Sequence, residues 1–385
     1  MIEARDFVEA ARGHGFEWYA GVPCSFLTPF INYVLQDETL HYVSMANEGD
    51  AVALIAGVAL SGARGVTMMQ NSGLGNAVSP LTSLTWTFRI PQLLIVTWRG
   101  QAGVADEPQH ALMGPITPTM LDTMEIPWEI FPTEADAIEP ALRRAKAHMD
   151  SHGRPYALLM QKGSVASYPL RESAPRRAVR HTRAVIETRD LALASRATRG
   201  QVLSEVVART SLDSAVLATT GFCGRELYAL SDRPNQLYMV GSMGCVLPLA
   251  IGLALARPDL RVLALDGDGA ALMRLGAFAT AGAYAPANLK HLLLDNGVHD
   301  STGGQATVAP QVSFGEIAAA CGYASALETD DVSRLEGWLN DSSPGPHFAR
   351  MLTKPGSPHD LPRPSVGPAE VKLRWQRHFG ALEHA

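Results

Sequence analysis

The strongest indication of the fold of this chain comes from two apolar segments, each of which ends in acidic or amide side chains. Residues 262–265 run into a Gly-Asp-Gly turn at 267–269, and residues 292–294 run into an Asp-Asn-Gly turn at 295–297. A helical pattern over residues 271–283 separates the two segments. This order predicts a βαβ unit with polar groups at the carboxyl ends of neighbouring parallel strands, where open α/β sheets bind their ligands.

The side chains in these turns suit a metal and a diphosphate. Asp268 and Asn296 offer hard oxygen atoms that could share one Mg²⁺, a metal that takes few protein ligands together with phosphate oxygens. Gly267 and Gly269 allow the backbone to approach a diphosphate closely. A lone Gly-Asp-Gly turn is usually only a strand-to-helix connection, but its pairing with the second turn resembles the diphosphate-binding signature of thiamine-diphosphate enzymes.

Length, composition and charge narrow the class of protein. A chain of 385 residues with 46% hydrophobic residues predicts two domains with well-packed cores. The net charge of −6 argues against nucleic acid as a general partner. No apolar run approaches the roughly 20 residues of a membrane span. We expect a cytoplasmic protein, because the N-terminus has no secretory pattern and the four cysteines lack metal-site spacing.

Strand and helix patterns alternate in both halves of the chain, which predicts α/β architecture with doubly wound parallel sheets. Residues 166–195 interrupt this alternation with a segment rich in Arg, Ser and Pro. This segment could bind an anion, but its composition favours a linker. We therefore predict two domains, residues 1–165 and 196–385, the second ending in a C-terminal arm.

Glu48 opens a helical pattern of small residues in the first half. A thiamine cofactor needs a carboxyl group on N1′ of its aminopyrimidine ring. By itself, Glu48 is better explained as a helix-start carboxylate stabilised by the helix dipole. In combination with the two turns of the second half, we favour the cofactor contact and name Glu48 as the activating acid.

Motifs along nearly the whole chain resemble the phosphonopyruvate decarboxylases, a thiamine-diphosphate- and Mg²⁺-dependent family related to sulfopyruvate decarboxylases. The segments that carry the resemblance include GVPCSFLTPFINYV, ANEGDAVALIAGVALSGARG, DEPQHALMG, GSMG, LDGDGAALMRLG and LDNGVHDSTGGQ. It implies the thiamine-diphosphate-binding fold in both domains, without the middle domain of larger enzymes. It also implies a homodimer or a dimer of dimers with active sites at the interface.

The resemblance also implies a role for individual residues of the second half. Asp268, Asn296 and the carbonyl of Val298 would bind Mg²⁺, and Asp266 would support them. Met243 would hold the cofactor in a bent shape, although a methionine here could also be a core side chain. The other residues implied in cofactor binding are Thr220, Gly221, Gly241, Ser242, Gly267 and Gly269. Cys245 follows the GSMG motif where many relatives carry histidine, so its role stays open.

The substrate implied by the resemblance is a small anionic 2-oxo acid, which needs cations and hydrogen-bond donors. Arg99 offers a planar fork for an oxyanion, unless it is a solvated arginine. His110 could relay protons as a catalytic residue or simply make structural hydrogen bonds. Ser25 could donate to the substrate or cap the following helix. Asn71 and His299 complete the candidates for substrate binding.

The implied reaction is the non-oxidative decarboxylation of 3-phosphonopyruvate to phosphonoacetaldehyde and CO₂, a step of phosphonate and antibiotic biosynthesis. The alternatives are decarboxylation of sulfopyruvate or another 2-oxo acid, and carboligation with the same cofactor. A nicotinamide enzyme is excluded, because no Gly-x-Gly-x-x-Gly motif follows a strand with an acidic residue about 20 positions further on.

Overall fold

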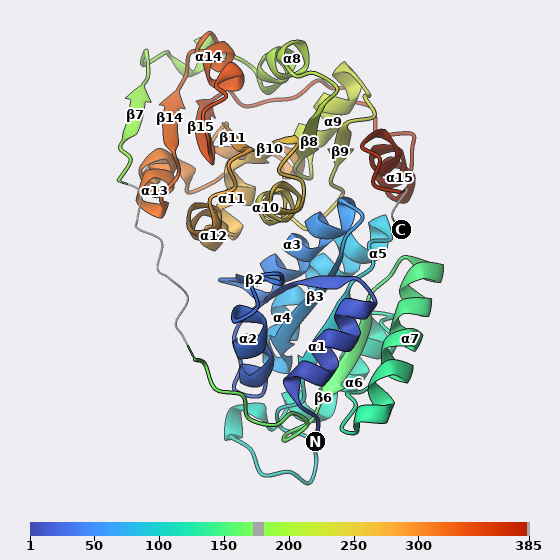
Figure 1. The fold of residues 1–385 in the computed structure, drawn as a ribbon. Helices are drawn as coiled ribbons and strands as arrows, with labels where there is room; N and C mark the ends of the chain where they lie inside the picture. Colours follow the sequence, from blue (N-terminus) through green and yellow to red (C-terminus); the bar gives the residue numbers. More distant parts are fainter. Residues whose placement is uncertain (172–180, 383–385) are drawn as a thin grey trace. The chain divides into compact units, whose positions relative to one another are not determined.

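The computed structural model describes residues 1–171 and 181–382, and these two stretches form two compact units. Each unit contains one large parallel sheet whose strands alternate with helices along the chain (Figure 1). The predicted α/β class with parallel sheets is therefore confirmed. None of the helices in the described stretches is long and apolar enough to cross a membrane.

The first unit has a six-stranded sheet in the order β2-β1-β3-β4-β6-β5, with every pairing parallel. Its strands are β1 (Phe16–Gly21), β2 (His41–Ser44), β3 (Arg64–Gln70), β4 (Leu93–Thr97), β5 (Trp128–Ile130) and β6 (Tyr156–Met160). Its α-helices are α1 (Ala4–Gly13), α2 (Thr28–Leu35), α3 (Glu48–Leu60), α4 (Asn71–Pro80), α5 (Trp86–Phe88), α6 (Met113–Thr123) and α7 (Ala135–His152).

Both faces of this sheet are buried. In β4, Leu93 and Ile95 belong to one apolar cluster, while Leu94 and Val96 belong to another. Successive side chains of a strand point to opposite faces, so the two clusters are the two sides of the sheet. This is why the strand is an unbroken apolar run instead of an alternating one.

The second unit has a seven-stranded parallel sheet in the order β7-β14-β15-β11-β10-β8-β9. Its strands are β7 (Ala184–Glu187), β8 (Ser214–Ala218), β9 (Gln236–Tyr238), β10 (Arg261–Gly267), β11 (Leu289–Asp295), β14 (Ser325–Thr329) and β15 (His347–Leu352), beside a small hairpin of β12 (Val298–His299) and β13 (Gln305–Ala306). Its α-helices are α8 (Arg199–Arg209), α9 (Phe222–Leu230), α10 (Val246–Ala256), α11 (Asp268–Met273), α12 (Gly276–Tyr284), α13 (Phe314–Cys321), α14 (Arg334–Asn340) and α15 (Pro368–His378).

Strands β10 and β11 are direct neighbours, as the βαβ prediction requires, and Gly267 pairs with Leu294 in the parallel register. The connection between them differs from the single helix predicted over residues 271–283. Arg274 leaves the helical conformation (φ −138°, ψ 46°) and separates α11 from α12. The break comes just before Gly276, a residue type with weak helix propensity.

The segment predicted as a linker also contributes to the sheet. Strand β7 pairs in parallel with β14, with Ala184 opposite Ala326. A short edge strand of this kind carries little apolar periodicity, because half of its surroundings are solvent. The basic cluster proposed as a possible anion site includes residues 172–180, which lie outside the described residues.

Candidate active site

A cavity of about 160 Å³ lies in the second unit, where β8, β10 and β11 reach their carboxyl ends. It brings together residues that the sequence had marked at widely separated positions. Its lining includes Thr220, Gly221, Met243, Asp266, Gly267, Asp268, Gly269, Asn296, Val298 and His299. The three predicted metal ligands therefore share one cavity with candidate diphosphate-binding residues.

Asp268 is the first residue of α11 and is 4% exposed. The hydroxyl of Thr307 donates a 2.6 Å hydrogen bond to its Oδ2 atom. Burial raises the pKa of Asp268 to about 6; the Thr307 hydrogen bond opposes this rise and Asp295 adds to it. The carboxylate therefore lies where a bound cation would strongly favour its ionised form.

Asn296 lies in a tight turn after β11. Its Oδ1 atom accepts a 3.1 Å hydrogen bond from the Val298 backbone, and its Nδ2 atom donates to Asp300 at 2.7 Å. Gly297 adopts φ +71°, which suits glycine at this position. One carboxylate, one amide and a nearby backbone carbonyl form an oxygen-only set that fits Mg²⁺. Among the described residues, no three His, Cys, Asp or Glu side chains form a group that could hold a metal, so this oxygen set includes an amide and a backbone carbonyl beside its one carboxylate.

Asp266 and Asp295, the acidic residues next to the proposed ligands in the chain, both have partners within the protein. Asp266 accepts a 2.8 Å bond from the Gly267 backbone, and its other oxygen lies 3.4 Å from Nε2 of His291. Asp295 forms a buried ion pair with Arg350 at 2.5 Å. Both acids therefore shape the turns that carry Asp268 and Asn296.

Other residues of the cavity lining fit a phosphate group. Thr219 is 3% exposed, and its hydroxyl oxygen has no hydrogen-bond partner among residues 1–171 and 181–382. Gly221 has φ +90° and precedes the first turn of α9, so that the start of this nine-residue helix lines the cavity. Helix N-termini bind anions through their backbone N–H groups and dipole. The orphaned hydroxyl and the helix start are the features expected of a diphosphate site.

Close side-chain contacts explain why position 269 is a glycine. A Cβ atom there would lie 2.4 Å from Cε1 of His299 and 3.2 Å from Cε of Met243. Both side chains therefore pack over the Gly-Asp-Gly turn. Gly241 and Ser242 precede Met243 with positive φ angles of 145° and 49°.

Cys245, the residue of open role, is buried and lies just before α10. It does not line the cavity, and we assign it no site role.

Glu48 lies at the start of α3 in the first unit. The Asn47 side chain caps this helix by accepting a 2.8 Å bond from Gly49. The Glu48 carboxylate accepts a 2.9 Å hydrogen bond from Asn76 and lies against α4. A Cβ atom on Gly73 would be only 2.3 Å from Cδ of Glu48. Helix α4 therefore lacks a side chain where the carboxyl group crosses it.

Four of the five substrate candidates come together in the first unit, whereas His299 belongs to the second. Asn71 donates to the Arg99 carbonyl at 2.8 Å, and Arg99 Nη1 donates to the Ser25 hydroxyl at 3.4 Å. The His110 backbone packs on Gly100, where a Cβ atom would lie 2.0 Å from its carbonyl oxygen. Oδ1 of Asn71 and Nδ1 of His110 are buried, and neither has a partner in the described part of the chain.

Arg99 is not a solvated arginine. Its Nε atom donates to Oδ2 of Asp106 at 2.7 Å, its Nη2 donates to the same carboxylate, and its guanidinium lies 4.8 Å from the Phe26 ring centre. The hydrogen bond from Arg99 holds the pKa of Asp106 well below its usual range. The capping role considered for Ser25 is not observed, because α2 begins at Thr28 without a side-chain cap.

Sequence patterns missed several residues around the two sites. Arg199 lines the cavity of the second unit and pairs with Glu226, and Thr307 contacts Asp268. A Thr198–Gln201 capping box marks the start of α8 and was a readable signal for that helix. Nothing in the local pattern, however, connects Arg199 with its partners.

Two family models match the chain. The N-terminal thiamine pyrophosphate (thiamine diphosphate) binding domain covers residues 3–125, and the C-terminal one covers residues 220–342. A phosphonopyruvate decarboxylase of Streptomyces viridochromogenes is 44% identical over 98% of this chain and 94% of its own length. The chain belongs to the phosphonopyruvate decarboxylase family of thiamine pyrophosphate enzymes. A second such family member, from Streptomyces hygroscopicus, is 43% identical over the same shares of the two chains.

More distant proteins agree with this family. A sulfopyruvate decarboxylase of Methanosarcina acetivorans is 28% identical over 96% of this chain and 95% of its own. The solved benzoylformate decarboxylase of Polynucleobacter necessarius covers 93% of this chain and 100% of its own, with a TM-score of 0.72 and 13% identity. This likeness concerns the fold alone. The predicted thiamine-diphosphate-binding fold and the predicted cofactor, with Mg²⁺ as its usual partner metal, are confirmed.

Proposed function

We propose that this chain decarboxylates 3-phosphonopyruvate to phosphonoacetaldehyde and CO₂, with thiamine diphosphate and Mg²⁺. The observation that carries the proposal is the 44% identity to a phosphonopyruvate decarboxylase over 98% of the chain. The described cavity supports it, because hard oxygen donors and a helix N-terminus occur together there. We place the reaction in phosphonate biosynthesis, including that of antibiotics.

In this proposal, Asp268, Asn296 and the Val298 carbonyl hold Mg²⁺, and Thr219, Thr220 and Gly221 hold the diphosphate. Burial of Asp268 supports its role, since an ionised carboxylate at that depth needs a cation. The orphaned Thr219 hydroxyl supports the second group, since it lacks a partner within the described residues and a phosphate oxygen would provide one.

When bound, the cofactor supplies a thiazolium that accepts the electron pair left by the departing CO₂. The residues of this chain orient it and move protons. The Gly241 carbonyl would accept a hydrogen bond from the pyrimidine amino group, Ser242 lies in the same loop, and Met243 would support the cofactor. Glu48 holds a proton at N1′ of the aminopyrimidine ring and so activates the cofactor.

The substrate site that we propose contains Ser25, Asn71, Arg99 and His110, with His299 from the second unit. Within the described residues, Nδ1 of His110 is buried and has no hydrogen-bond partner, which supports a role of His110 in proton transfer. Asp106 occupies Nε and Nη2 of Arg99, so Nη1 is the atom proposed to reach the anion.

We propose a homodimer in which Glu48 of one chain serves the metal site of the other. Two half-sites on separate units of the chain support this arrangement. The test mixes Glu48→Gln and Asp268→Ala chains by joint refolding. Random pairing restores one intact site in half of the dimers, so about a quarter of wild-type activity should return. Recovery of no activity from the mixture would contradict shared sites. Sedimentation of the wild type would distinguish the dimer from a dimer of dimers.

The proposed substrate is tested by CO₂ release from the purified protein with phosphonopyruvate, sulfopyruvate and pyruvate side by side. We expect the highest kcat/KM for phosphonopyruvate. Sulfopyruvate is the second candidate, because a sulfopyruvate decarboxylase matches 96% of the chain at 28% identity. A sulfonate carries one charge less than a phosphonate dianion. A preference for pyruvate would overturn the proposed substrate and leave the fold and cofactor standing.

A further inference from the structure

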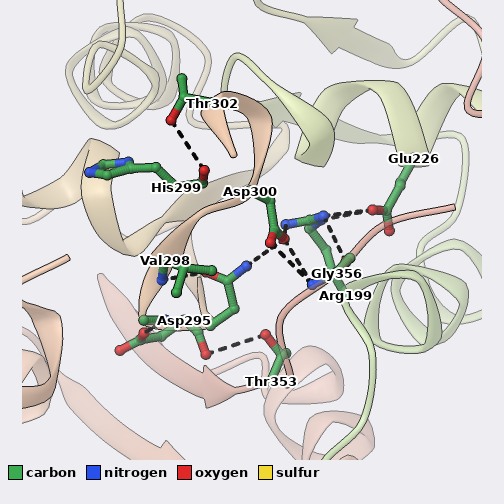
Figure 2. Close-up of polar contacts among 11 residues, drawn as sticks. Arg199, Glu226, Asp295, Val298, His299, Asp300, Thr302, Thr353 and Gly356 are labelled. Carbon is green, nitrogen blue, oxygen red and sulfur yellow. Dashed lines mark hydrogen bonds and ion pairs between the residues drawn. The ribbon is translucent and has the colours of Figure 1, made fainter. Parts of the chain in front are cut away.

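Arg199 joins separate parts of the second unit at the edge of the cavity. It is the first residue of α8 and is 9% exposed. Its Nε and Nη2 atoms donate to Oε1 of Glu226 at 3.0 and 2.7 Å, and its Nη1 atom donates to Oδ2 of Asp300 at 3.1 Å (Figure 2). One buried guanidinium thus connects α8 and α9 with the loop that follows the Asp-Asn-Gly turn.

Asp300 receives donors from three directions. Besides Arg199, its carboxylate accepts from the Gly356 backbone N–H at 3.1 and 3.2 Å and from Nδ2 of Asn296 at 2.7 Å. An ionised carboxylate can only accept hydrogen bonds, so it selects the NH₂ end of the Asn296 amide. The Oδ1 atom of Asn296 is then on the opposite side of the amide, where it accepts the 3.1 Å bond from the Val298 backbone and keeps a second lone pair that a Mg²⁺ ion would bind.

The buried ion cluster of Arg199, Glu226 and Asp300 does not by itself indicate a more stable fold. Removing three charged groups from water is costly, and apolar replacements are often equally stable. Burial alone would lower the pKa of Arg199, but Glu226 and Asp300 outweigh it, so the pKa is raised and the cation persists. What the cluster does provide is a single geometry for Asp300.

We propose that Arg199 is a positioning residue of the metal site: by holding Asp300, it fixes the Asn296 amide with Oδ1 presented for Mg²⁺. The inference rests on the proposed function, because it takes Asn296 to be a metal ligand. The Gly356 carbonyl, which accepts from Arg199 at 3.3 Å, adds the segment after β15 to the same cluster. The site is thereby ordered before the metal arrives, which lowers the cost of binding.

The test compares Arg199→Lys and Asp300→Asn with the wild type. Mg²⁺ is titrated calorimetrically into metal-free protein at a fixed, saturating concentration of thiamine diphosphate. Both variants should bind Mg²⁺ about 10–100-fold more weakly, the usual effect of losing a group that orients a metal ligand. Arg209→Lys is the matched control, because Arg209 lies on the same helix and pairs at the surface with Glu205 and Glu336. Its Mg²⁺ affinity should be unchanged.

Two further measurements separate positioning from general stability. At saturating Mg²⁺, kcat of Arg199→Lys should return toward the wild-type value, with KM for the 2-oxo acid unchanged. The double variant with Asp300→Asn should bind Mg²⁺ no more weakly than the weaker single variant, since both changes break one connection. A lower melting temperature with unchanged Mg²⁺ affinity would overturn the proposal.

The outcomes also separate this proposal from the proposed function. If Asp268→Ala abolishes Mg²⁺ binding but Arg199→Lys and Asp300→Asn stay within twofold of the wild type, the positioning role is wrong and the metal site stands. If Asp268→Ala binds Mg²⁺ like the wild type, the metal site itself is wrong and the positioning role fails with it. Should Arg199→Lys not fold, Asp300→Asn decides, because it preserves the side-chain shape.

Discussion

The hydroxyl of Thr307 donates a 2.6 Å hydrogen bond to Oδ2 of Asp268, although the two residues are 39 positions apart. Asp268 is the only carboxylate among the three proposed metal ligands. Its affinity for Mg²⁺ therefore depends on how easily it ionises. Burial works against ionisation, and Thr307 partly restores it.

Mg²⁺ binding should weaken as the pH falls through about 6. The pKa of Asp268 is raised to about 6 by burial, and the metal binds only the ionised carboxylate. Thr307→Val removes a bond that favours the ionised form, so its loss of affinity should begin at a higher pH. Calorimetric Mg²⁺ titrations between pH 5 and 8 would measure this shift.

The test depends on the difference between the pH profiles of Mg²⁺ affinity in the wild type and in Thr307→Val, because titration of the cofactor diphosphate affects both proteins equally. Thr182→Val is a suitable control, since Thr182 donates to the Tyr323 carbonyl elsewhere in the unit. Superimposable pH profiles for wild type and Thr307→Val would contradict the assignment.

Gly73→Ala should displace the Glu48 carboxyl group and reduce kcat while the protein stays folded. The added Cβ would lie 2.3 Å from Cδ of Glu48, but that side chain can move, so the fold should tolerate it. Alanine is also a better helix former than glycine by about 1 kcal/mol. Gly75→Ala on the same helix is the control, because nothing lies within 4 Å of its Cβ. Wild-type kcat in Gly73→Ala would argue against the role of Glu48.

Glu48→Gln should lower kcat by about 10²–10⁴-fold, the range typical of lost acid–base catalysis. An amide can still accept the hydrogen bond from Asn76, so α3 and α4 should keep their contact. Thiamine diphosphate content after gel filtration should remain near that of the wild type. The exposed Glu38, changed to Gln, serves as control. Near-wild-type turnover in Glu48→Gln would remove it as the activating acid.

Arg99→Lys should raise KM for phosphonopyruvate by about 10–100-fold, since charge-assisted hydrogen bonds contribute roughly 1.5–3 kcal/mol. Steady-state kinetics would measure KM, with the exposed Arg143→Lys as control. A KM within twofold of the wild type would exclude Arg99 from the substrate site.

The same ion pair contributes to stability in a pH-dependent way. Arg99 keeps the pKa of Asp106 below its usual range, so this pair stabilises the fold above about pH 4 and the contribution is lost only at lower pH.

Much of the fold was accessible from sequence because it depends on local periodicity. The turns at 267–269 and 295–297 mark the ends of adjacent strands, and the structure places these strands side by side. The helix predicted over residues 271–283 was wrong in detail, because Arg274 breaks it. Strand β7 was missed, because an edge strand of four residues carries too few buried positions to show a pattern.

Some residues of the candidate site could likewise be proposed from the sequence, and others could not. Asp268, Asn296 and Glu48 could be proposed because the residue type and its place after a strand or before a helix suggest the chemistry. The positioning role of Arg199 could not be proposed from the sequence, because its partners Glu226 and Asp300 lie 27 and 101 positions away along the chain.

The alternating α/β pattern, the two polar turns and the family could be recognised without a structure, because each depends on consecutive residues. The contacts of Asn296 with Asp300, of Asp300 with Arg199 and of Glu48 with Gly73 became visible only in three dimensions. Side-chain contacts of this kind depend on how helices pack against strands in three dimensions, and a single sequence does not record that packing.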